Sequence, residues 1–139
     1  MNKTNLITPL VAALLLGAGG ALAHDDAYLD SVAAPNGGQL RMAGPYHYEL
    51  VLAKEGGEPQ ERPILVYVTD HAGQAIPTFG ATGTATLLSS QGRVTATLAP
   101  DGDNRMKGIA AYAATPGMKA VVGIALAGKG PEQARFTPK

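Results

Sequence analysis

The feature that most constrains the fold is a two-residue alternation of side chains in short segments that turn residues separate. Side chains on a β-strand point alternately to opposite faces, so this pattern is typical of strands with one buried face. It is plainest in residues 46–53, where two tyrosines and two leucines share a face. The predicted core-facing residues are Tyr46, Tyr48, Leu50 and Leu52, and His47, Glu49, Val51 and Ala53 face the other way.

Strand patterns recur along the rest of the chain, with turn signals about every ten residues. The other predicted strands are residues 39–42, 64–69, 82–89, 93–99, 105–112, 119–126 and a last strand that ends near Phe136. No convincing helical period follows the first 23 residues. The sequence therefore predicts an all-β fold, an antiparallel immunoglobulin-like β-sandwich of about seven to eight strands, with a small β-barrel as the alternative.

The N-terminus is typical of a secretory signal peptide. Lys3 precedes an apolar run at residues 10–16, and Ala-Leu-Ala at residues 21–23 supplies the small residues that signal peptidase requires. Three glycines interrupt the apolar stretch, which makes it too short for a good membrane span. We predict cleavage between Ala23 and His24, and a periplasmic or secreted protein without membrane insertion after signal removal.

The chain then divides into three parts. Residues 1–23 form the signal peptide, residues 24–35 an N-terminal arm, and residues 36–139 the β-sandwich domain. A short helical turn, an ordered arm and disorder are the alternatives for the arm. The remaining length fits one domain that buries a single modest core.

Composition excludes several classes of function. Without Lys3, ten basic residues face eleven acidic ones, and no basic stripe predicts nucleic-acid binding. The chain has no cysteine, which excludes disulfides, thiolate metal sites and cysteine nucleophiles. No nucleophile elbow and no phosphate-binding glycine loop occur, and adjacent carboxylates lie only in polar segments. We therefore predict that the protein is not an enzyme.

Metal binding has more support from the residues. His24, His47 and His71 supply imidazoles, which suit copper, zinc and nickel. A histidine at the mature N-terminus can chelate an ion through its α-amino group and its ring, and a second histidine completes a T-shaped, brace-type copper site. Asp25 and Asp26 would add oxygen ligands beside it.

His47 and Glu49 share a strand face, about 7 Å apart along the strand. That spacing fits a metal ligand and a carboxylate that hydrogen-bonds to it. The metal candidates are therefore His24, His47, Glu49 and His71. The alternatives are that His24 is simply the first residue after cleavage, that His47 and Glu49 form a partly exposed polar face, and that His71 is an exposed turn residue.

Three short segments carry a family resemblance. They read Asn-Gly-Gly-Gln at 36–39, Gly-Pro-Tyr-His-Tyr-Glu-Leu-Val at 44–51 and Val-Tyr-Val-Thr-Asp-His-Ala-Gly at 66–73. With them, residues 34–136 resemble a small β-domain of periplasmic heavy-metal efflux systems. That domain occurs at the front of metal-efflux adaptor proteins and as free-standing periplasmic proteins.

The resemblance implies His47 as a ligand and Glu49 as its partner, whereas Asn36 stands where that family often has histidine. We therefore expect an exported transition-metal-binding protein, with copper favoured over zinc or nickel, that acts as a metal chaperone or buffer in metal tolerance. Its expected partner is a metal-efflux or cell-envelope protein. The alternative function is a non-catalytic interaction module of such an assembly, which would use the polar face of residues 46–53.

Overall fold

The computed structural model describes residues 24–54 and 57–139. Their elements are α1 (Asp26–Ser31), β1 (Gln39–Ala43), β2 (Tyr46–Leu52), β3 (Gln60–Asp70), β4 (Thr82–Ser89), β5 (Gly92–Pro100), β6 (Arg105–Tyr112), β7 (Lys119–Ala125) and β8 (Pro131–Phe136). The predicted all-β class is confirmed. The predicted signal peptide lies outside the described residues. Within those residues, no helix has the length and apolar character needed to cross a membrane.

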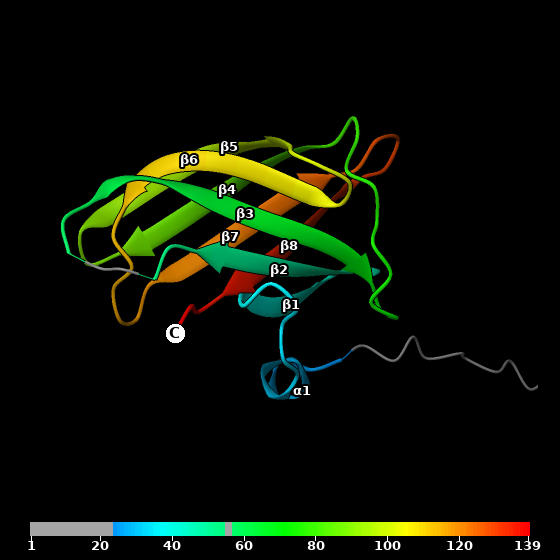
Figure 1. The fold of residues 1–139 in the computed structure, drawn as a ribbon, viewed down its shortest axis with the longest axis horizontal. Coiled ribbons are helices and arrows are strands. Elements are labelled where there is room, and N and C mark those ends of the chain that lie inside the picture. The colour runs from blue at the N-terminus through cyan, green and yellow to red at the C-terminus, as the bar shows by residue number, and fades with distance from the viewer. Residues whose placement is uncertain (1–23, 55–56) are drawn as a thin grey trace, which may run out of the picture.

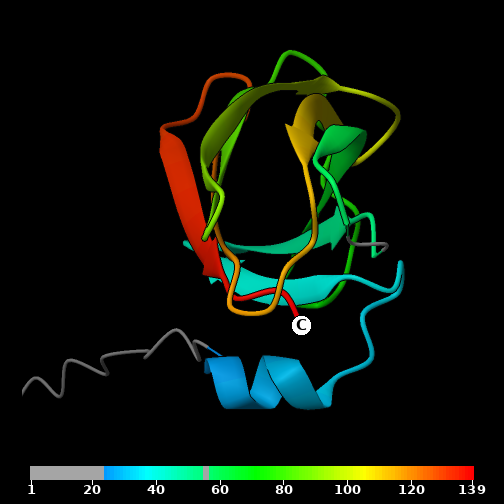
Figure 2. The ribbon, with the colours of Figure 1, turned by 90° about the vertical axis from the view of Figure 1, so that its left-hand side faces the viewer.

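The eight strands form one antiparallel sheet in the order β1-β2-β3-β6-β5-β4-β7-β8 (Figure 1). Its two halves join through a short ladder between β5 and β6, in which Ala99 pairs with Lys107 and Pro100 with Met106. The sheet curls until its end strands, β1 and β8, contact each other (Figure 2). The fold is thus a nearly closed barrel, compatible with both the predicted sandwich and the barrel alternative.

The core face predicted for β2 is confirmed. Tyr48 and Leu50 are buried, and Tyr46 and Leu52 pack against the core cluster. The Tyr48 hydroxyl lies 3.4 Å from the carbonyl oxygens of Ile124 in β7 and Glu132 in β8. Burial raises the pKa of Tyr48, so its phenol stays a neutral hydrogen-bond donor. This side chain ties the two halves of the sheet together across the core.

The opposite face of β2 is covered rather than partly exposed. His47 is 7% exposed and Glu49 is 3% exposed. The covering segment is the N-terminal arm, whose helix α1 contacts β1 and lies outside the sheet, below β1 and β2 (Figures 1 and 2). The alternative of a partly exposed polar face is therefore wrong for His47 and Glu49, because His24 of the arm contacts His47 and the turn at residues 36–38 contacts Glu49.

The arm forms a helix because local and tertiary contacts agree. Asp25 is the N-cap, and its carboxylate accepts a hydrogen bond of 2.7 Å from the Tyr28 amide. Leu29, on the sheet-facing side, is 3% exposed. Burial of this one leucine gives the arm an apolar anchor on the sheet.

The largest difference in a strand boundary is at the start of β3. This strand was predicted from residue 64, but it begins at Gln60 because Gln60, Glu61 and Arg62 pair with the end of β6. The long-range partner, rather than local composition, sets this boundary.

Candidate metal centre

The fold brings the three histidines into one cluster. His24 lies just before α1, His47 in β2 and His71 in the turn after β3. Their ring centroids lie 5.3 Å apart for His24 and His47, 4.9 Å for His47 and His71, and 5.9 Å for His24 and His71. His47 pairs with Thr69 in the β2–β3 ladder, so the chain that leaves β3 places His71 beside it.

Two ring nitrogens face each other at a distance suited to one ion. Nδ1 of His24 lies 3.4 Å from Nε2 of His47. With metal–nitrogen bonds near 2 Å, two nitrogens on one ion lie at most about 4 Å apart. Nδ1 is also the ring nitrogen closer to the main chain, which a histidine uses when it chelates together with its own amino nitrogen.

His71 contributes packing rather than a second nitrogen at that position. Its ring stacks on His47 with 20° between the planes, and its Nε2 lies 3.4 Å from the Gly44 carbonyl oxygen. Gly44 has a φ of +56°, and a Cβ there would collide with the Glu132 carboxylate. The β1–β2 turn is thus held close to Glu132 of β8 and contacts His71 through the Gly44 carbonyl, while the His71 ring packs on His47.

Side chains alone do not complete a three-ligand site. In residues 24–54 and 57–139, no group of three or more His, Asp or Glu side chains is arranged to hold a metal ion. The cluster instead offers one pair of imidazole nitrogens at ligand distance. A three-nitrogen site needs a donor that is not a side chain.

The electrostatics of the cluster favour neutral imidazole. Burial lowers the pKa of His47, and the nearby His71 and His24 lower it further, whereas Asp70 acts in the opposite direction. A lowered pKa leaves His47 neutral at neutral pH, and neutral imidazole is the form that binds metal ions. His47 is therefore prepared as a ligand without a proton to displace.

Glu49 is not brought to the histidines. Its Oε1 accepts hydrogen bonds from the amides of Asn36 and Gly38, at 2.8 and 3.0 Å, and its Oε2 accepts one of 2.9 Å from the Asn36 side chain. The carboxylate thus fastens the turn that leads into β1. These bonds keep the Glu49 carboxylate outside the histidine contacts, and its role beside a metal-bound His47 stays a prediction. Asn36 donates two of these bonds.

The two aspartates after His24 are likewise used inside the arm. Asp25 caps α1, and Asp26 forms an ion pair of 3.4 Å with Arg41 in β1. Both carboxylates therefore have a partner in the docked arm, and their role as oxygen ligands stays a prediction.

Sequence reasoning missed Tyr28, whose ring centroid lies 4.6 Å from that of His24. His24 precedes the N-cap of α1, so helical spacing gave no signal for this contact, which depends on how the chain enters the helix.

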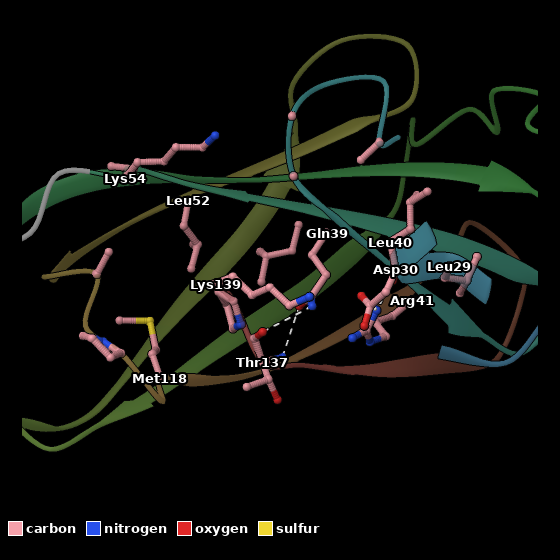
Figure 3. A pocket seen from close by; sticks show the side chains of 18 of the residues that line it. Leu29, Asp30, Gln39, Leu40, Arg41, Leu52, Lys54, Met118, Thr137 and Lys139 are labelled. Atoms are coloured by element: carbon pink, nitrogen blue, oxygen red, sulfur yellow. Dashed lines mark hydrogen bonds and ion pairs between the residues drawn. The ribbon is translucent and has the colours of Figure 1, made fainter. Parts of the chain in front are cut away.

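A cavity of about 780 Å³ lies beside α1 rather than at the histidines (Figure 3). The arm, β1, β2, residues 114–118 and the C-terminal residues line it, and none of the three histidines does. At its edge, the Gln39 side chain donates to the Thr137 carbonyl and accepts from its amide, at 3.2 and 3.1 Å. The cavity and the histidine cluster are separate features.

Comparison with protein-family models gives no match, and comparison with curated proteins gives no significant match. The histidine cluster and the N-terminal sequence are therefore the features of the chain that bear on its function.

Proposed function

We propose that this protein is an exported transition-metal-binding protein, with copper favoured, that acts as a metal chaperone or buffer in metal tolerance. The observation that carries the proposal is the 3.4 Å separation between Nδ1 of His24 and Nε2 of His47. Cleavage between Ala23 and His24 would free the α-amino group of His24. One ion would then have three nitrogen donors, two from His24 and one from His47.

Copper is favoured by the donor set. The site would offer nitrogen donors without thiolate, and Cu²⁺ binds such sites more tightly than Ni²⁺ or Zn²⁺ in the general order of divalent affinities. His24 and His71 are half-buried rather than enclosed. An ion at this surface can be passed on, which suits a chaperone or buffer better than a structural metal site.

The alternative, an interaction module that uses the polar face of β2, has less support. β2 pairs with β1 on one side and β3 on the other, so it has no free edge. His47 and Glu49 on that face are buried. A partner protein would have to displace the arm to reach them.

Calorimetric titration of the mature chain that begins at His24 tests the proposal. We expect one Cu²⁺ per chain, bound more tightly than Zn²⁺ or Ni²⁺ and with a dissociation constant below about 1 μM, equivalent to roughly 8 kcal/mol. If none of the three ions binds that tightly, the metal-binding proposal is wrong.

Substitutions of single residues identify which groups donate nitrogen ligands to the ion. We expect His47→Ala to abolish tight binding, His24→Ala to weaken it strongly and His71→Ala to weaken it less. The control is Gln133→Ala, because the Gln133 side chain on β8 is exposed and this change should leave metal binding unchanged. A chain with one extra residue before His24 keeps every side chain but loses the amino group of His24. Unchanged affinity in that chain would exclude the amino group as a donor.

A further inference from the structure

We propose that Arg41 positions His24 at His47 by holding α1 on β1, so that docking of the arm and metal binding are thermodynamically coupled. This inference rests on the proposed function. It adds a positioning residue that touches none of the histidines in the contacts of the cluster.

Arg41 is the polar anchor of the arm. Its Nη1 donates to Asp30 at 2.9 Å, and its Nε lies 3.4 Å from an Asp26 oxygen. Figure 3 shows Asp30 and Arg41 facing each other. The Arg41 side chain is only 9% exposed, whereas the two aspartates are more accessible. Asp26 and Asp30 are four residues apart, so both carboxylates project from one face of α1 toward this guanidinium.

The helix cannot hold this position alone. It has six residues, far fewer than the roughly 12–15 that an isolated helix needs for even marginal stability. Leu29 is its one buried residue. Docking therefore depends on one apolar contact, from Leu29, and one charged contact, from Arg41.

Docking of α1 determines where His24 lies, because His24 precedes the helix by only two residues. If the arm leaves the sheet, His47 keeps its place in β2 but loses the nitrogen 3.4 Å away. The apparent affinity for the ion then falls in proportion to the docked fraction of the arm. By linkage, a bound ion must stabilise the docked arm by the same factor.

The hydrogen bond from Arg41 also keeps its partner charged. It lowers the pKa of Asp30, and the charge of Arg41 acts in the same direction against partial burial. The pair is therefore fully ionised at neutral pH, as docking requires.

The test compares the mature chain with Arg41→Gln by nuclear magnetic resonance and copper binding. Without metal, we expect ring contacts between His24 and His47 in the wild type and their loss in Arg41→Gln. With copper, we expect Arg41→Gln to weaken binding about tenfold, within the range typical of coupled sites. At saturating copper, its electron paramagnetic resonance spectrum should still show the nitrogens of His24, because the bound ion selects the docked arm.

Three further variants complete the experiment. Asp26→Asn/Asp30→Asn removes the partners from the arm without altering the barrel, and should reproduce both effects if Arg41→Gln fails to fold. Arg41→Lys should restore part of the affinity, because lysine keeps the charge without the forked geometry. Arg105→Gln, which breaks the ion pair with Asp101 elsewhere, should change nothing.

The outcomes separate this inference from the proposed function. If the wild-type chain binds no copper, the metal function is refuted. If the contacts between His24 and His47 are nevertheless present in the wild type and lost in Arg41→Gln, the positioning role is supported. Retention of those contacts or of wild-type affinity in both Arg41→Gln and the double aspartate variant overturns the inference.

Discussion

At the residue scale, His47 and Glu49 show how two neighbours on one strand face acquire different roles. Both are buried, and both are covered by the N-terminal segment. The start of the arm brings an imidazole to His47, whereas the turn that follows the arm, residues 36–38, brings two amides and an amide side chain to Glu49. The strand pattern correctly predicted that His47 and Glu49 share a face. It could not predict which segment would cover each of them.

The first prediction concerns Glu49→Gln. An amide in place of the carboxylate keeps one acceptor oxygen but points an NH₂ group at the donors from Asn36 and Gly38. We expect a loss of about 1–3 kcal/mol in the free energy of unfolding, as for a buried group left without its partner. Urea denaturation measures it, with exposed Glu61→Gln as the control. If Glu49→Gln lowers the copper affinity but not the free energy of unfolding, the assignment of a structural role to Glu49 is wrong.

The second prediction concerns the pH dependence of metal-free stability. Burial lowers the pKa of His47 below its usual value of 6.5, so the unfolded chain binds a proton at this residue first as pH falls. Stability from this group is therefore complete above pH 6.5 and is lost progressively below it, until the folded state also takes up the proton.

Urea denaturation between pH 8 and 5 should show this loss in the wild type, and His47→Gln should lack that component. Equal slopes in the two proteins would contradict the predicted role of His47 in the pH dependence.

At the scale of elements, the local sequence pattern predicted the strands but did not predict the helix of the N-terminal arm. Alternation and turn residues located the strands closely, and for β4 and β6 the predicted bounds are those observed. The helix α1 has few local determinants, since its stability comes from Leu29 and from Arg41 in a different element. The metal candidates His24 and His47 were identifiable as residue types, but their meeting depended on this docking.

The third prediction separates the arm from the barrel. Leu29→Ala removes the apolar contact of α1, and its cost to global stability cannot exceed the free energy of docking the arm. Leu87→Ala, in the core on β4, should cost about 2–5 kcal/mol. Urea denaturation should therefore show a smaller loss for Leu29→Ala, while hydrogen exchange accelerates at the amides of residues 26–31. Equal losses would mean that the arm folds as one unit with the barrel.

At the scale of the whole molecule, the choice between sandwich and barrel was beyond the sequence. It depends on crossovers such as β3 to β6 and β4 to β7, and on how far the sheet curls. Those pairings join segments distant in the chain, and local alternation carries no information about them. The short β5–β6 ladder is the link that makes the two halves one sheet.

The fourth prediction tests that link through Gly108 in β6. A Cβ there would lie 2.7 Å from the Thr97 carbonyl oxygen of β5 and 3.0 Å from the Leu98 side chain. We expect Gly108→Ala to force the strands apart and to cost about 1–3 kcal/mol, the usual range for overpacking. Gly130→Ala, where a Cβ would meet nothing within 4 Å, is the matched control. Thermal unfolding measures both, and similar midpoints would contradict the close approach of β5 and β6.

The central claim is that the barrel and its arm bring His24 and His47 onto one metal ion. The most direct measurement is the crystal structure of the copper-loaded mature chain, with the ion located by its anomalous scattering. We predict one ion about 2.0–2.1 Å from both Nδ1 of His24 and Nε2 of His47, as is usual for metal–nitrogen bonds. An ion bound elsewhere, or bound to only one of these two histidines, would contradict the claim.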